Sequence, residues 1–133
     1  MSDQVVISVD HLRKDFGQVR ALDSVSFKVR KGEVFGFLGH NGAGKSTTVR
    51  ILNGLLQPTE GTCRVWNLSP RTDGPDLRLR TGVLPESPSL DERLTARENL
   101  LYFADLYRVP EQEVSSRIDE LLTQFGLIDR AED

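Results

Sequence analysis

The residues best suited to chemistry in this chain form one glycine-rich stretch, Gly39-His-Asn-Gly-Ala-Gly-Lys-Ser-Thr47. Gly39, Gly44, Lys45 and Ser46 fill the fixed positions of the pattern G-x-x-x-x-G-K-[ST]. Glycines permit positive φ angles, so the backbone can turn its N–H groups toward phosphate oxygens. A lysine at this spacing can bridge terminal phosphates, and the serine hydroxyl can ligate Mg²⁺. The stretch therefore predicts a phosphate-binding loop.

The whole loop is expected to contact the phosphates of a nucleotide such as ATP. Between its fixed positions lie His40, Asn41, Gly42 and Ala43. His40 stands at a position that tolerates variation, so we expect its side chain to be neutral and exposed. Thr47 lies on the first turn of the following helix, where it can reach the α-phosphate. That helix directs the positive end of its dipole at the same anion.

The alternative interpretation of the stretch is a glycine-rich turn with a solvated lysine. The pattern arises by chance in about half a percent of chains of this length, given average residue usage. The flanking sequence also favours phosphate binding. Residues 34–38 are mostly apolar and predict a strand that leads into the loop, and residues 48–56 predict the helix that follows it.

Among the elements that must position this loop, strands dominate before Pro88 and helices after it. We expect strands at residues 5–9, 24–29, 62–66 and 81–84. Thr95 and Glu98 match the capping-box pattern, which predicts a helix over residues 96–107. A second helix is expected from Pro110 to Gly126, with an apolar stripe formed by Val114, Ile118, Leu121, Leu122 and Phe125. We therefore predict a nucleotide-binding core over residues 1–87 and the start of a helical subdomain over residues 88–133.

Composition limits the possible partners. The 133 residues include 17 basic and 20 acidic side chains, which give a net charge of −3. We therefore do not expect nucleic acid as a partner, because binding to it usually needs a basic domain or a basic stripe on the surface. The N-terminus has no signal-peptide pattern, and no apolar run approaches the roughly 20 residues that span a bilayer. We expect a cytoplasmic chain that meets a membrane only through a partner.

Several tracts together resemble the ATP-binding subunit of ABC transporters. The loop agrees with the Walker A motif of that family, and the tracts 21–27, 31–36 and 52–61 are similar to its flanking sequence. The stretches 84–86 and 94–100 look closest to the drug- and ion-exporter branch. The resemblance implies an α/β fold: a P-loop NTPase core with an N-terminal antiparallel β-subdomain and the start of a helical subdomain. It also implies ATP and Mg²⁺ as cofactors.

The resemblance assigns roles to two residues outside the loop. Phe16 takes the place of the aromatic residue that stacks on adenine, although by pattern alone it suits a buried aromatic at the end of a strand. Glu86 stands where the family usually has the Q-loop glutamine, which contacts Mg²⁺ and the attacking water and senses the membrane partner. A carboxylate can ligate Mg²⁺, but it adds negative charge near the γ-phosphate, and the alternative is a solvated loop glutamate. Within the loop, Lys45 becomes the expected catalytic residue and Ser46 the second metal ligand.

Three motifs that the family needs for hydrolysis do not occur in the sequence: the Walker B Asp-Glu, the Ser-Gly-Gly signature and the switch histidine. Asp119-Glu120 is an acidic pair, but it lies on the polar face of a predicted helix. We therefore expect the N-terminal half of a longer protein, which binds ATP and hydrolyses it little. For the full protein, the resemblance implies a transmembrane permease, a second ATPase subunit in a homodimer, and export of a substrate.

Two other functions remain open at this level. One is a soluble ABC-family ATPase module without a membrane partner. The other is a small P-loop kinase, which would need a substrate-binding lid with basic residues after the loop and which the antiparallel strand tracts before Gly32 fit poorly.

Overall fold

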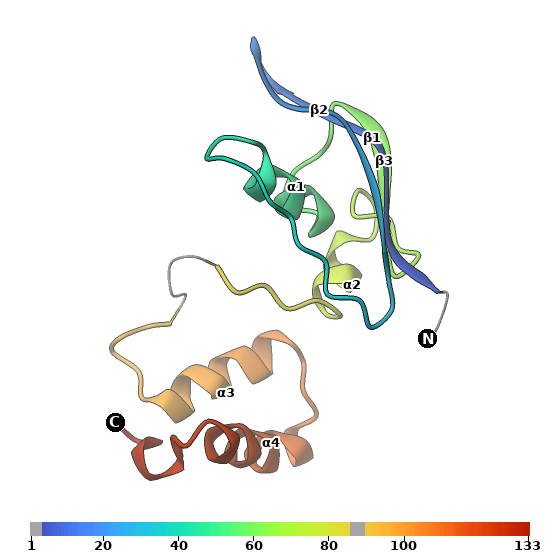
Figure 1. The fold of residues 1–133 in the computed structure, drawn as a ribbon. Coiled ribbons are helices and arrows are strands. Elements are labelled where there is room, and N and C mark those ends of the chain that lie inside the picture. Colours follow the sequence, from blue (N-terminus) through green and yellow to red (C-terminus); the bar gives the residue numbers. More distant parts are fainter. Residues whose placement is uncertain (1–3, 86–89) are drawn as a thin grey trace. The chain divides into compact units, whose positions relative to one another are not determined.

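A computed structural model describes residues 4–85 and 90–133, drawn as a ribbon in Figure 1. The chain divides into two compact units, residues 1–82 and 83–133, and each is described by itself. None of the helices in the described part has the length and apolar character that a membrane crossing requires. The boundary predicted after residue 87 falls within residues 86–89, outside the described residues, and it stays a prediction.

The first unit is built on a three-stranded antiparallel sheet with the order β2-β1-β3. Its strands are β1 (Val5–Phe16), β2 (Val19–Arg30) and β3 (Glu60–Val65). β1 and β2 form a long hairpin, and β3 returns on the other edge of β1 (Figure 1). The predicted strands at 5–9, 24–29 and 62–66 are confirmed in position. β1 and β2 are longer than predicted, because the two strands form backbone hydrogen bonds with each other along the whole hairpin.

β1 contains a bulge that changes which face its side chains occupy. Three residue steps from Val9 to Leu12 match only two steps on β2, from Phe27 to Val25. Because side chains alternate along a strand, one extra residue reverses the alternation. Val9 and Leu12 consequently both face the core, with exposures of 3% and 0%. His11 within the bulge has a φ of 47°.

One helix, α1 (Lys45–Leu52), packs on the sheet of the first unit. Its residue Ile51 is fully buried against Val9, Leu12 and Leu22. Thr48, one turn earlier on the same side, is also buried, and its hydroxyl donates a 3.0 Å hydrogen bond to the Gly44 carbonyl. This small core ties the start of α1 directly to β1 and β2.

Residues 34–38 do not form the predicted strand. Phe35 and Phe37 point to the same side, since their rings lie 5.1 and 5.5 Å from that of Phe27, measured between ring centroids. Val34 and Leu38 point the other way and are 99% and 95% exposed. A strand requires a neighbouring strand for its backbone hydrogen bonds, and in the described ranges nothing pairs with this segment. Its apolar outer face is therefore left in solvent.

One further strand prediction is wrong, and one short helix was not predicted. Residues 81–84 have no regular structure, because no strand in the part of the chain that the structure describes pairs with them. A short helix that was not predicted, α2 (Gly74–Arg78), precedes them, and its Leu77 is fully buried.

The second unit is a helical hairpin of α3 (Ala96–Leu106) and α4 (Glu111–Gln124), followed by the short 3₁₀ helix η1 (Ile128–Arg130). The predicted capping box is confirmed: Glu98 N–H donates to Thr95 Oγ1 at 3.1 Å, and Thr95 N–H donates to Glu98 Oε2 at 2.8 Å. The buried stripe of α4 centres on Ile118 and Leu122. Phe125 was predicted to join it but is 71% exposed, because α4 ends at Gln124.

Candidate phosphate-binding site

The glycine-rich stretch forms a loop that leads directly into α1 (Figure 1). Gly42 and Gly44 have φ angles of 86° and 87°, in the left-handed region that favours glycine. Ala43 N–H donates to the His40 carbonyl at 3.1 Å and closes the turn. His40 and Asn41 are exposed, and His40 Nδ1 donates to the Asn41 carbonyl at 2.7 Å. The predicted loop residues are therefore brought together in one turn at the start of a helix.

The side chain of Lys45 bends back over the loop. Its Nζ donates to the carbonyl of Gly39 at 2.6 Å and to the carbonyl of His40 at 2.8 Å. An ammonium group has three donors, so two hydrogen bonds leave one for another acceptor. The positive charge is thus held at the loop by the loop's own backbone.

Gly44 packs against the β-sheet. A Cβ atom at this position would lie 2.5 Å from the Ala21 carbonyl oxygen and closer still to the side chain of Leu22. Leu22 itself is 3% exposed and belongs to the core with Ile51. Only a glycine therefore allows the loop to rest on β2 at this point.

The N-terminus of α1 has the properties of an anion-binding site. Gly44 is its N-cap residue, and no side chain caps the helix. Lys45, Ser46 and Thr47 form the first turn, where a helix leaves its backbone N–H groups without intrahelical acceptors. Those donors, the helix dipole and the Lys45 ammonium group all favour a negatively charged ligand here.

Of the two predicted metal ligands, the structure describes only Ser46. Its side chain lies on the first turn beside Lys45 and is exposed. Glu86 falls outside the described residues. Among the residues that are described, no three His, Cys, Asp or Glu side chains group to hold a metal ion. A lone hydroxyl fits Mg²⁺ that is bound mainly by phosphate oxygens and water, as is usual for this ion.

Phe16 lies at the end of β1, at the tip of the β1–β2 hairpin. It pairs with Val19, and its side chain is 47% exposed. It is therefore not the buried strand-end aromatic that pattern alone favoured. Lys14, two residues earlier, pairs with Leu22, the residue that packs on Gly44. Phe16 and the phosphate loop are therefore linked through the paired residues Lys14 and Leu22, because Leu22 packs on Gly44.

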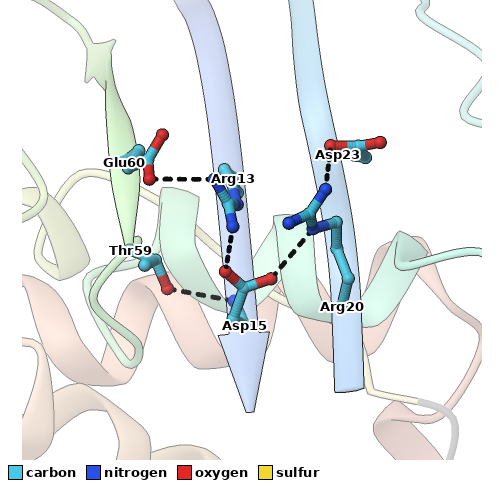
Figure 2. Close-up of polar contacts among 6 residues, drawn as sticks. All are labelled: Arg13, Asp15, Arg20, Asp23, Thr59 and Glu60. Atoms are coloured by element: carbon cyan, nitrogen blue, oxygen red, sulfur yellow. Dashed lines mark hydrogen bonds and ion pairs between the residues drawn. The ribbon is translucent and has the colours of Figure 1, made fainter. Parts of the chain in front are cut away.

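A network of charged side chains surrounds the strand just before Phe16 (Figure 2). Asp15 accepts from Arg13 at 2.8 Å and from Arg20 at 3.1 Å. Arg13 also pairs with Glu60 at 2.9 Å, and Arg20 pairs with Asp23 at 3.1 Å. Burial raises the pKa of Asp15, but the hydrogen bonds from Arg20 and Arg13 outweigh burial and hold that pKa below its ordinary value. The same contacts raise the pKa of Arg20.

Sequence reasoning missed several residues that shape this site. Leu22 and Ala21 support Gly44, and Lys14 lies with its Nζ 5.0 Å from the centroid of the Phe16 ring. A spacing of two residues along a strand signals that Lys14 and Phe16 share a face. No comparable signal links residues 21 and 22 to residue 44, because that contact joins distant parts of the chain.

Comparison with known proteins agrees with this geometry. A family model described as "ABC transporter" matches residues 22–133. The chain is 41% identical over 92% of its length to the daunorubicin resistance ATP-binding protein DrrA3 of Streptomyces coeruleorubidus, of which it covers 39%. It is 37% identical over 96% of its length to the Nod factor export ATP-binding protein I of Ralstonia nicotianae, of which it covers 40%. A solved structure described as the ATP-binding subunit of an ABC transporter matches 96% of this chain and 53% of its own, with a TM-score of 0.84 at 32% identity.

Proposed function

This chain belongs to the ABC transporter family, and on that premise we propose that its loop from Gly39 to Thr47 binds the phosphates of ATP. The observation that carries the proposal is the geometry at the start of α1. There, an uncapped helix N-terminus follows Gly44, and Lys45 Nζ lies 2.6 Å from the Gly39 carbonyl. The related drug-resistance and Nod factor export proteins are both named as ATP-binding, which supports ATP as the nucleotide. The matching α/β structures support the P-loop NTPase core.

The remaining ligand contacts follow from the same site. The loop residues His40, Asn41, Gly42, Ala43 and Gly44 would surround the phosphate oxygens, and the backbone N–H groups of the first turn of α1 would donate to them. The Thr47 side chain would reach the α-phosphate. Phe16 would stack on the adenine ring through its π face. Ser46, with Glu86, would hold Mg²⁺.

Lys45 is the residue we assign to catalysis. Its ammonium group would neutralise charge on the terminal phosphates, which is the main requirement of phosphoryl transfer. Bound Mg²⁺ would supply further charge neutralisation at the phosphate oxygens. Because the sequence holds no Walker B Asp-Glu pair and no signature motif, we propose that the 133-residue chain binds ATP and hydrolyses it slowly.

The chain spans 39% and 40% of the lengths of the two relatives described above. For the protein to which it corresponds, we propose an ATPase subunit that couples ATP hydrolysis to export of a substrate. It would act on the cytoplasmic face of a membrane through a permease subunit, and pair with a second ATPase subunit. The name of the Nod factor export protein supports the direction. A multisubunit assembly is supported by a solved structure described as cbiO1 from Clostridium perfringens, part of an ABC transporter complex, which matches 98% of this chain and 54% of its own with a TM-score of 0.83 at 26% identity.

Titration calorimetry of Mg²⁺–ATP tests the proposal. Lys45→Met removes the ammonium group that contacts the phosphates, and we expect it to weaken ATP binding by at least about tenfold, since hydrogen bonds to charged groups contribute roughly 1.5–3 kcal/mol. Lys31→Met, at an exposed lysine outside the loop, is the matched control and should bind ATP as the unaltered chain does. An unaltered chain that does not bind ATP, or equal binding by the Lys45 variant, would contradict the proposal.

The hydrolytic part is tested separately by phosphate release under saturating ATP. We expect the chain to turn over far more slowly than a complete ABC ATPase subunit measured beside it. Equal rates would show that the absent motifs are not needed.

A further inference from the structure

We infer that Lys14 is a positioning residue for the nucleotide base: its ammonium group covers one face of the Phe16 ring and leaves the opposite face to adenine. The inference rests on the proposed function, because it concerns the base that Phe16 would bind. It adds a residue to the site, and it assigns one side of the aromatic ring to the protein and the other to the ligand.

The backbone of β1 places the two side chains together. Lys14 and Phe16 are two residues apart on one strand, and such residues share a face. The bulge between Val9 and Leu12 puts Leu12 on the core side. Lys14 then lies opposite the buried Leu22, on the same side of the sheet as α1 and the phosphate loop.

The contact itself is a cation–π interaction. Lys14 Nζ lies over the ring of Phe16, 5.0 Å from the centroid, within the range of about 6 Å at which the ring quadrupole attracts a cation. Lys14 is half-buried, whereas Phe16 is 47% exposed. One ring face is therefore occupied while much of the ring stays accessible, as a flat ligand requires.

The adjacent carboxylate of Asp15 does not compete with the ring for Lys14, because neighbouring residues of a strand point to opposite faces of the sheet. Asp15 is paired with both Arg13 and Arg20 (Figure 2). An ammonium group paired with a carboxylate would be less available to an aromatic face. The Asp15 carboxylate therefore stays with Arg13 and Arg20 on one face, while Lys14 contacts Phe16 on the other.

The strand that carries both residues is also held in place from its β3 side. Asp15 N–H donates to Thr59 Oγ1 at 3.0 Å (Figure 2). Thr59 N–H in turn donates to the Arg13 carbonyl at 2.8 Å. These bonds, with the ion pairs of Asp15, fix the backbone immediately before Phe16. The ring is thus presented by an anchored strand end, and Lys14 restrains its remaining side-chain rotation. A preorganised ring binds a base at a smaller entropic cost than a mobile one.

The test compares two ligands that share phosphates and differ in the base. Affinities of Mg²⁺–ATP and of inorganic tripolyphosphate with Mg²⁺ are measured by calorimetry for the unaltered chain, Lys14→Gln and Lys14→Arg. We expect Lys14→Gln to weaken ATP binding by roughly two- to fivefold, the range of an exposed cation–π contact, and to leave tripolyphosphate binding unchanged. Lys14→Arg keeps the cation and should retain ATP affinity. Lys28→Gln, an exposed lysine on β2, is the control for charge alone.

A second measurement asks whether Lys14 acts through Phe16. In a Phe16→Ala background, we expect Lys14→Gln to have no further effect on ATP affinity, because the ring that it positions is gone. Thermal unfolding of each variant verifies that the fold is retained.

Several results would overturn the inference. Unchanged or tighter ATP binding by Lys14→Gln would mean that the lysine is irrelevant or competes with the base. An equal loss for tripolyphosphate would place Lys14 on the phosphates instead. ATP binding that depends on Lys45 but not on Lys14 would reject this inference alone, whereas an unaltered chain that does not bind ATP would reject the proposed function with it.

Discussion

Gly44 of the phosphate loop rests directly on Leu22 of β2, so closely that no Cβ atom fits between them. The contact joins the loop to the sheet at Gly44, which is also the N-cap residue of α1. It means that one glycine serves two purposes: it supplies the left-handed φ of 87° that the loop needs, and it leaves the space that Leu22 occupies. Loop geometry and core packing are therefore coupled at this position.

Gly44→Ala should disturb both purposes at once. The added methyl group would meet the Ala21 carbonyl at 2.5 Å and the Leu22 side chain, so we expect the free energy of unfolding to fall by about 2–4 kcal/mol, from strain at φ and overpacking together. Gly32→Ala is the matched control, since Gly32 has a φ of 80° but open space around it. It should lose only about 1–2 kcal/mol. Urea unfolding followed by circular dichroism measures both, and equal losses would show that packing on Leu22 is unimportant.

The ion pairs of Asp15 should make stability depend on pH in the acid range. Arg20 and Arg13 lower the pKa of Asp15 in the folded chain despite the opposing effect of burial. Because the pKa of Asp15 is lower in the folded chain than in the unfolded chain, the ionised carboxylate stabilises the fold. This stabilisation is fully present above the unfolded pKa of about 4, and it is lost as the pH falls through the folded pKa. We therefore expect the urea midpoint of the unaltered chain to fall more steeply below about pH 4 than that of Asp15→Asn.

At neutral pH the Asp15→Asn variant should already be less stable, because the arginines lose their shared carboxylate. Asp23→Asn is the control, since Asp23 pairs only with Arg20 in the described contacts and its side chain is 71% exposed. Parallel pH profiles for the unaltered chain and Asp15→Asn would be inconsistent with the assigned role of Asp15.

Asn99 should be the polar residue on which the second unit depends most. It is 7% exposed, its Oδ1 accepts from Asp91 N–H at 3.0 Å, and its Nδ2 lies within 3.1 Å of the carbonyls of Asp91, Leu94 and Thr95. Asn99→Leu keeps the volume but leaves these backbone groups without their partner, so we expect a loss of about 2–4 kcal/mol in the free energy of unfolding. Gln112→Leu, at an exposed position of α4, should change it by less than about 0.5 kcal/mol. Similar values for the two variants would argue against the hydrogen-bonded role.

The exposed apolar face of residues 34–38 should cause self-association of the 133-residue chain. Val34 and Leu38 are 99% and 95% exposed on a segment that pairs with no strand among residues 4–85 and 90–133, and such surfaces promote edge-to-edge contact. We expect sedimentation velocity to show concentration-dependent association that Val34→Lys with Leu38→Lys abolishes. Val19→Lys, at a 68% exposed valine in the paired hairpin, should not abolish it. A monomer at every concentration tested would refute the expectation.

Much of this architecture was predictable because it depends on local sequence. The capping box of Thr95 and Glu98 formed as expected, since its two hydrogen bonds join residues three apart. That residues 34–38 lack strand structure was not predictable, because strand pairing depends on residues elsewhere in the fold. The exposure of Phe125 likewise depended on where α4 ends.

By itself, the sequence determined the phosphate loop, since the spacing of Gly39, Gly44, Lys45 and Ser46 specifies which backbone and side-chain groups meet one another at a helix start. Only the tertiary structure decided which side of the sheet Phe16 and Lys14 occupy, because one extra residue in the bulge before Leu12 reverses the alternation of a strand. It also decided what lies behind Gly44: the loop rests on Leu22 through a contact between residues far apart in the chain, and such contacts have no local signal.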